Sequence, residues 1–203
     1  MELKIMPLGA FATNSFLVFM NETEELFIID PADEAEKIIA EAKKFPFKTA
    51  RILLTHAHID HISAAGRVAK ALAVAKVELA EGDHDMYMSE ENAIAPYFPP
   101  AKDLPEVSGF DEITNCKVIS LPGHIKGGSG FLFDDGKEKF LIVGDTLFAG
   151  SIGRTDLYGG DYAQLIKSIT EKLLVLPDDL TVYPGHGGET TIGFEKKHNP
   201  YIN

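Results

Sequence analysis

The segment Thr55-His56-Ala57-His58-Ile59-Asp60-His61 contains four side chains that can bind a metal ion. It directly follows the apolar run at residues 51–54, which is typical of a buried strand. We therefore expect three imidazoles and one carboxylate at the C-terminal end of that strand. Imidazole suits zinc, iron, copper or nickel, and the carboxylate widens the choice of metal. Burying so many titratable groups without a cation would be costly, so the segment predicts a metal site.

Three further candidate ligands each follow a short apolar run and stand beside a glycine. They are His124 in Pro122-Gly123-His124, Asp145 in Gly144-Asp145-Thr146 and His186 in Pro184-Gly185-His186. Glycine lets the backbone turn sharply and keeps side-chain bulk away from a site. Each of these motifs alone is an ordinary turn. Four such strand ends together favour a convergent metal centre over the alternative, a surface loop that happens to be rich in histidine.

The elements that must position these ligands follow from the apolar pattern. It predicts strands at residues 15–20, 25–30, 51–54, 76–80, 117–121, 130–133, 139–143 and 180–183, and helices at 32–44, 62–75 and 161–176. Asp134-Asp135-Gly136 is typical of a tight hairpin turn. The proline-rich residues 81–115 interrupt the pattern, and long irregular segments in compact domains are often lids or binding loops. We expect one domain, residues 1–203, with 81–115 as a lid or insertion over the site.

With HxHxDH, a later His, a later Asp and a final His in this order, the chain resembles the metallo-β-lactamase superfamily over essentially its whole length. Residues 144–157, GDTLFAGSIGRTDL, are similar to the glyoxalase II-like branch of small hydrolases. The resemblance implies an α/β fold, an αββα sandwich with the metal site at one edge between the two sheets. It also implies hydrolysis of a small-molecule thioester or ester such as S-lactoylglutathione.

The same resemblance implies two divalent metal ions, with zinc favoured and iron or manganese also compatible with the ligands. His56, His58 and His124 would hold the first metal, Asp60, His61 and His186 the second, and Asp145 would bridge both. Five neutral imidazoles and two carboxylates leave two divalent ions with a net positive charge, which favours a bridging hydroxide. Two metals roughly 3.5–4 Å apart lower the pKa of a bridging water toward about 7. Asp60 would then be catalytic as well as a ligand if it takes a proton from that water.

Arg154 and Tyr158 follow Asp145 on one loop and are candidate substrate-binding residues. A guanidinium can pair with a substrate carboxylate, bidentately where the geometry allows. The alternative is a structural arginine that ties down the loop by bonding to Asp156 or to the backbone. The sequence supports both interpretations about equally.

Two departures from the family pattern bear on the metal and the substrate. Ile125 and Lys126 stand where the family more often has Thr and Pro, which could alter the contacts that orient His124. Only 17 residues follow His186, whereas the larger glyoxalase II enzymes carry a C-terminal helical region that helps to bind glutathione. A thiol other than glutathione therefore stays open as the leaving group.

Two further activities on the same fold are alternatives to a thioesterase. One is an oxidoreductase resembling the mononuclear iron persulfide dioxygenases, which share the run Arg154-Thr155-Asp156. Those relatives use fewer ligands, so the full set of ligand positions here favours two metals. The other is a lactonase or esterase.

Composition narrows the setting in which the protein acts. The net charge of −12 argues against nucleic acid and against anionic lipid as partners. No apolar run approaches the length that spans a bilayer, and the N-terminus lacks the pattern of a signal peptide. The single cysteine, Cys116, fits a reducing compartment. We expect a cytoplasmic protein, and the sequence leaves its oligomeric state open.

Overall fold

The chain folds as two compact units, Met1–Asp111 and Glu112–Asn203. The computed structural model describes residues 1–93 and 98–202. Among the helices in these residues, none combines the length and the apolar composition needed to cross a bilayer.

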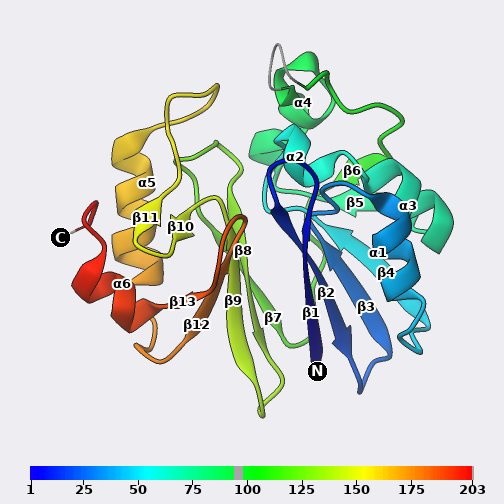
Figure 1. Ribbon diagram of the computed structural model, residues 1–203, viewed down its shortest axis with the longest axis horizontal. Helices are drawn as coiled ribbons and strands as arrows, with labels where there is room; N and C mark the ends of the chain where they lie inside the picture. The colour runs from blue at the N-terminus through cyan, green and yellow to red at the C-terminus, as the bar shows by residue number, and fades with distance from the viewer. Residues whose placement is uncertain (94–97, 203) are drawn as a thin grey trace. The chain divides into compact units, whose positions relative to one another are not determined.

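A six-stranded sheet forms the first unit (Figure 1). Its strands, in spatial order, are β1 Glu2–Leu8, β2 Thr13–Met20, β3 Glu25–Ile29, β4 Thr49–Leu53, β5 Lys76–Glu78 and β6 Glu106–Ser108. The first three strands pair antiparallel, and β3 to β6 pair parallel. Because parallel neighbours end at the same edge, the residues that follow β3 and β4 lie next to each other.

Helix α1 (Ala35–Ala42) packs beside α3 (Ala65–Leu72) on one face of this sheet (Figure 1). It buries Ala35, Ile38, Ile39 and Ala42, the positions expected from the helical spacing. The predicted helix at 32–44 was too long at its start, because Glu34 adopts the left-handed region with φ of 48°. A left-handed residue cannot continue a right-handed helix, so the helix begins after it.

The helix predicted at residues 62–75 is wrong at its start. A short helix, α2 (Ile59–Ile62), begins inside the histidine-rich segment, and α3 follows after a break. His58 is extended at the N-terminal end of α2, while Ile59 and Ile62 are buried. Burial of these two isoleucines turns the chain into a helix early and places Asp60 and His61 on its first turn.

The segment at residues 81–115, predicted to be a lid, contains short elements of regular structure. They are η1 Glu81–Asp83, α4 His84–Tyr87, η2 Glu90–Asn92 and the edge strand β6. Part of the segment therefore belongs to the sheet. Residues 94–97 lie outside the described residues, and the lid role stays a prediction.

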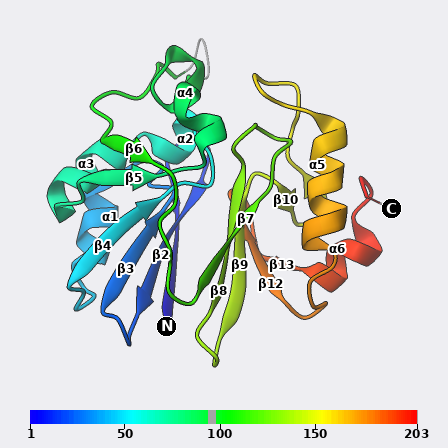
Figure 2. The same cartoon turned by 180° about the vertical axis from the view of Figure 1, so that it is seen from behind.

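A five-stranded sheet forms the second unit, and helices cover one of its faces (Figure 2). Its strands, in spatial order, are β13 Thr190–Thr191, β12 Thr181–Pro184, β9 Lys139–Gly144, β8 Ser129–Asp134 and β7 Cys116–Ser120. A small ribbon pairs β10 (Leu147–Phe148) with β11 (Ser151–Ile152). The helices are α5 Tyr162–Ser168, the π-helical turn η3 Ile169–Leu173, and α6 Ile192–His198. The predicted turn at Asp134-Asp135-Gly136 is confirmed, since it joins the antiparallel strands β8 and β9.

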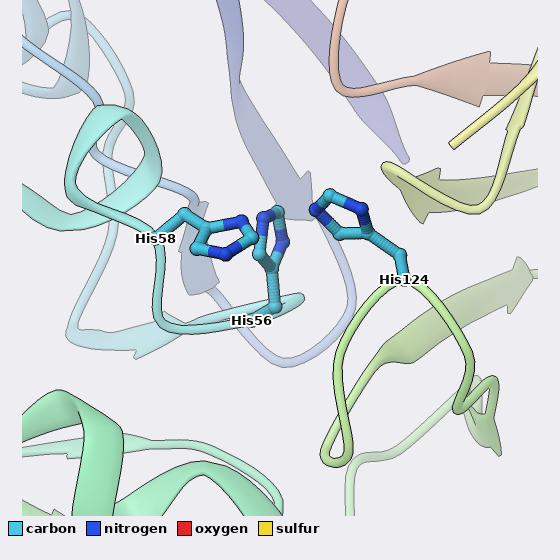
Figure 3. Close-up of side chains that lie close together, drawn as sticks. All are labelled: His56, His58 and His124. Carbon is cyan, nitrogen blue, oxygen red and sulfur yellow. The ribbon is translucent and has the colours of Figure 1, made fainter. Parts of the chain in front are cut away.

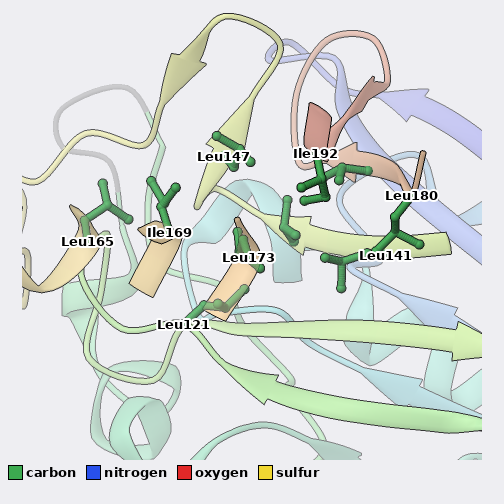
Figure 4. Close-up of a cluster of buried hydrophobic side chains, with 10 residues drawn as sticks. Leu121, Leu141, Leu147, Leu165, Ile169, Leu173, Leu180 and Ile192 are labelled. Atoms are coloured by element: carbon green, nitrogen blue, oxygen red, sulfur yellow. The ribbon is translucent and has the colours of Figure 1, made fainter. Parts of the chain in front are cut away.

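The core of this unit lies between α5, η3 and strands β9 and β12 (Figure 4). Leu165, Ile169 and Leu173 recur every four residues and are fully buried against the sheet. This spacing is the one that predicted the helix at 161–176. Asp161 accepts a hydrogen bond from the backbone N–H of Gln164 at 3.0 Å and caps the start of α5.

Gly123, beside the predicted ligand His124, packs against the backbone of α5. Its φ is 137°, and a Cβ at this position would lie 2.2 Å from the Cα of Leu165. We expect Gly123→Ala to lower the free energy of unfolding by about 3 kcal/mol, because it adds both backbone strain and a clash. Urea denaturation measures the change, and Gly109→Ala is the control, since a Cβ at Gly109 meets no atom within 4 Å. Equal stability of the two variants would contradict this.

Candidate metal centre

The first unit gathers three imidazoles and one carboxylate on the loop that follows β4 and on α2. Figure 3 shows His56 and His58 on that loop. The ring centroids of His56 and His58 are 4.8 Å apart, and those of His56 and His61 are 4.1 Å apart. Asp60 Oδ2 lies 3.7 Å from His61 Nε2. The four side chains predicted from the HxHxDH segment therefore lie close together, and the three imidazoles are buried.

Asp30 orients the histidines of this unit from the end of the neighbouring strand β3. It is fully buried, and its carboxylate accepts hydrogen bonds from Thr55 N at 2.7 Å and Thr55 Oγ1 at 2.6 Å. His61 Nδ1 lies 2.9 Å from Asp30 Oδ2, so it donates to the carboxylate. With the proton on Nδ1, the lone pair of His61 Nε2 is available to a metal.

Thr55 fixes the tautomer of His56 in a similar way. Its hydroxyl proton is donated to Asp30, so its oxygen accepts from His56 Nδ1 at 3.0 Å. His56 Nε2 is then also a lone-pair donor. The Nε2 atoms of His56, His58 and His61 are buried and make no hydrogen bond within the described residues, while other contacts hold the rings. Lone-pair nitrogens beside a carboxylate are the donor set that suits a divalent transition metal.

Two more contacts fix the loop. Asp83, which is buried, accepts a hydrogen bond from the backbone N–H of Ala57 at 3.3 Å. Thr13 Oγ1 donates to Asp60 Oδ2 at 3.2 Å. Both contacts hold backbone or side-chain atoms of the ligand segment in place from other elements of the same unit.

The second unit brings its three predicted ligands together around one carboxylate oxygen. His124 lies on the loop that follows β7 (Figure 3), Asp145 follows β9 and His186 follows β12. Asp145 Oδ2 is 3.7 Å from His124 Nε2 and 3.4 Å from His186 Nε2. His124 Nδ1 donates to the carbonyl oxygen of Arg154 at 2.7 Å. This bond leaves the lone pair on the Nε2 atom that faces Asp145, an arrangement that suits metal binding.

The β10–β11 hairpin holds both Asp145 and the carbonyl that orients His124. Asp145 precedes β10, and Arg154 follows β11. Gly153 packs so closely on the turn between β9 and β10 that a Cβ there would lie 1.9 Å from the carbonyl oxygen of Asp145. The hairpin thereby links the positions of two predicted ligands.

Glu195 of α6 anchors the tip of this hairpin. Its fully buried carboxylate accepts from Gly150 N at 3.1 Å, from Thr190 Oγ1 at 2.5 Å and from Asn199 Nδ2 at 2.7 Å. Asn199 Nδ2 also donates to the carbonyl oxygen of Ser151 at 3.0 Å. A buried carboxylate is costly unless donors surround it, and here three groups do so.

Arg154 pairs with Asp156 through two hydrogen bonds, Nε to Oδ1 at 2.7 Å and Nη2 to Oδ2 at 2.8 Å. The guanidinium lowers the pKa of Asp156 to about 2, so the pair is ionised at neutral pH. This contact is the one that the structural alternative anticipates. Tyr158 is 56% exposed, and Lys126 Nζ lies 5.4 Å from the centroid of its ring. The substrate role of Arg154 and Tyr158 stays a prediction.

A model of the metallo-beta-lactamase superfamily matches residues 8–186. The chain belongs to this superfamily. It is 36% identical over 216 residues to hydroxyacylglutathione hydrolase GloC of Haemophilus influenzae, covering 100% of this chain and 99% of that protein.

Two solved structures resemble the chain along almost its entire length. One is BLEG-1, a B3 metallo-beta-lactamase, with 33% identity, a TM-score of 0.87 and 99% coverage of both chains. The other is TTHA1623 in a di-iron-bound form, with 35% identity, a TM-score of 0.87 and coverage of 98% of this chain and 99% of that one. The αββα fold class predicted from the sequence is thereby confirmed. The histidine and aspartate clusters in a member of this superfamily point to divalent metals.

Sequence reasoning missed Asp30, Asp83 and Glu195, none of which is a predicted metal ligand. Asp30 was assigned to the end of a strand, and Asp83 to the segment at residues 81–115. The sequence signal for Asp30 was its position between the apolar residues 26–29 and Pro31. Acidic side chains are rarely buried unless they are paired, so an acid at the end of a buried strand indicates a specific role. Glu195 sits in the charged run Glu195-Lys196-Lys197 and carries no such signal.

We expect Asp30→Asn to weaken metal binding about 10- to 100-fold, as for other residues that orient a metal ligand. The amide keeps the size of the side chain but places an NH₂ group against Thr55 or His61. Competition of the purified protein with a chelating dye measures zinc affinity. Asp85→Asn, an exposed carboxylate of the same unit, is the control. Unchanged affinity in a folded Asp30→Asn protein would contradict the orienting role.

Glu195→Gln should cost about 1–3 kcal/mol of unfolding free energy, because one acceptor of a buried network becomes a donor. It should also reduce zinc affinity, since the anchored hairpin sets Asp145 and the Arg154 carbonyl. Urea denaturation and dye competition test both effects, with the exposed Glu171→Gln as the control. A loss of stability with unchanged affinity would show that the hairpin holds its ligands without Glu195.

Proposed function

We propose that this protein is a binuclear metal-dependent hydrolase of thioesters such as S-lactoylglutathione. The observation that carries the proposal is the approach of two imidazoles, His124 and His186, to one carboxylate oxygen of Asp145. A carboxylate oxygen that lies near two imidazole nitrogens is suited to bridge two cations. The similarity to GloC along the full chain supports a thioester as the substrate.

The resemblance to the metallo-β-lactamase superfamily supplies the ligands proposed for the two metals. His56, His58 and His124 form the first set, Asp60, His61 and His186 the second, and Asp145 belongs to both. Each set contains neutral imidazoles, and the bonds from Nδ1 of His56, His61 and His124 leave Nε2 as the donor. Zinc suits these ligands, and iron or manganese is also compatible with them. Bound metals would supply an activated water and polarise the substrate carbonyl.

Asp60 is the proposed proton acceptor of the reaction. Its side chain is 12% exposed, so one face of the carboxylate is accessible, and the hydroxyl of Thr13 stabilises its charged form. Hydrolysis adds water across the C–S bond of the thioester and yields a carboxylic acid and a thiol. A proton taken up by Asp60 from the water is then available to the leaving sulfur.

Arg154 and Tyr158 are the proposed contacts for the polar part of the substrate. Arg154 is already paired with Asp156, so a substrate carboxylate would have to share or displace that partner. The electrostatic attraction of glutathione to this paired arginine is therefore weaker than its attraction to an unpaired arginine would be. Together with the single cysteine and the acidic composition, these features support a cytoplasmic enzyme for a small-molecule substrate.

The experiment measures hydrolysis of S-lactoylglutathione and the metal content of the same purified sample. We expect turnover with about two metals per chain, and a loss of at least about 100-fold in Asp145→Asn, because that change weakens both metal sites at once. Glu171→Gln is the control and should keep full activity. Two metals without turnover would refute the thioester and favour esters or lactones. One iron per chain with oxygen consumption would favour the persulfide dioxygenase-like alternative.

A further inference from the structure

A pocket of about 370 Å³, open to solvent, lies in the second unit between the loop that follows β7 and the loop that leads into α5. This volume is within the range of ligand sites. Three glycines and one proline line the pocket, so much of its wall is backbone. Asp161 N donates to Gly123 O at 2.7 Å and joins the two loops. The polar side chains in the wall are those of Lys126, Asp161 and Gln164.

Lys126 supplies a cation that no carboxylate of the protein neutralises. Its ammonium nitrogen lies 5.4 Å from the centroid of the Tyr158 ring, and within the described residues it forms no ion pair and no hydrogen bond. Arg154, by contrast, is held by Asp156 through two hydrogen bonds. An aromatic ring attracts a cation but removes none of its charge. The three N–H donors of the ammonium therefore stay available to an anionic group in the pocket.

Asp161 supplies the opposite charge. Its Oδ1 accepts a hydrogen bond from Gln164 N at 3.0 Å, which orients the carboxylate. Its Oδ2 makes no hydrogen bond within the part of the chain that the structure describes. A ligand that carries only a carboxylate would meet the like charge of Asp161, and a ligand that carries only an ammonium would meet that of Lys126. Both charges of the wall are matched when one ligand carries both groups.

We propose that this pocket binds an α-amino carboxylate, and that in the thioesterase reaction it holds such a group on the thiol part of the substrate. The carboxylate of the ligand contacts Lys126, and its ammonium contacts Asp161. The inference rests on the proposed function and adds the chemistry of the leaving thiol. Gly123 of the wall directly precedes the proposed metal ligand His124, so the pocket lies beside the loop that carries this ligand. It also gives a role to Lys126, one of the two departures from the family pattern.

Binding of L-glutamine to the purified full-length protein tests the pocket without any reaction. This probe carries an α-amino carboxylate on a short neutral chain. Saturation-transfer NMR should give a signal for L-glutamine that is about threefold stronger than the signals for two analogues, as expected for one exposed charge contact. N-acetyl-L-glutamine lacks the ammonium, and 4-aminobutanamide lacks the carboxylate. Equal signals from the three probes would overturn the proposal.

Lys126→Gln and Asp161→Asn should each weaken the L-glutamine signal by a similar factor. Asparagine caps a helix about as well as aspartate, so Asp161→Asn removes the charge and keeps the start of α5. Lys167→Gln and Glu171→Gln are the matched controls, because they remove the same charges from exposed positions of the same unit outside the pocket. A signal that is the same in all four variants would overturn the proposal.

The S-lactoyl thioesters of glutathione and of N-acetylglutathione test the assignment to the substrate. The two thiols differ only in the ammonium of the α-amino carboxylate. In the unmodified protein, KM should be about fivefold higher for the N-acetylglutathione thioester, the upper end for an exposed charge pair. Asp161→Asn should remove this difference, whereas Glu171→Gln should keep it. Equal KM values for the two thioesters in the unmodified protein would overturn the assignment to the substrate and leave a free amino acid as the ligand.

The two assays separate this inference from the proposed function. L-glutamine binding that follows the variants in a protein without thioesterase activity would refute the proposed function and support the pocket. Hydrolysis of S-lactoylglutathione with no variant-dependent binding of L-glutamine would support the thioesterase and overturn the α-amino carboxylate site.

Discussion

The buried carboxylate of Asp30 is the interaction on which the metal-binding half of the first unit depends. It lies at the end of β3, where the parallel strand β4 also ends, and it accepts hydrogen bonds from Thr55 and His61. A buried charge is tolerated only when donors surround it, so its position and the position of the histidine loop are mutually fixed. Its left-handed backbone, with φ of 49°, is a strained conformation for a residue with a side chain. The contacts around the carboxylate hold the backbone there.

In the second unit, a backbone carbonyl fixes the tautomer of a histidine. A carbonyl oxygen, that of Arg154, holds the proton of His124 on Nδ1, where the first unit uses a carboxylate and a hydroxyl. The carbonyl itself is held by the β10–β11 hairpin and by Glu195 of α6. In both units the bond at Nδ1 decides which nitrogen can bind a metal. A fixed tautomer lowers the cost of binding, because the ring is already oriented before the ion arrives.

The ligands could be predicted from the sequence, whereas the residues that orient them could not. His56, His58, Asp60 and His61 are ligand types packed into seven residues after an apolar strand, a density that would be unfavourable to bury without a bound cation. Asp30 and Glu195 look ordinary in sequence, since their role comes from burial and from partners distant along the chain. The strands β10, β11 and β13 have two residues each, too few for any alternation to be recognised. Helix α2 begins at Ile59, before the predicted helix start at residue 62. Burial of Ile59 and Ile62 outweighs the local sequence pattern from which that start was predicted.

Charge places a further limit on the chemistry. The chain carries a net charge of −12, and its candidate substrate-binding arginine is paired with Asp156, whose pKa is lowered to about 2. That pair persists across the neutral range, so the arginine contributes little net positive field to an approaching anion. At physiological ionic strength, solvent-exposed acids more than about 8 Å away are largely screened. The groups close to the bound substrate therefore decide its affinity. An anionic substrate must therefore gain its binding energy from the metals and from hydrogen bonds, whereas an apolar group gains it by leaving water.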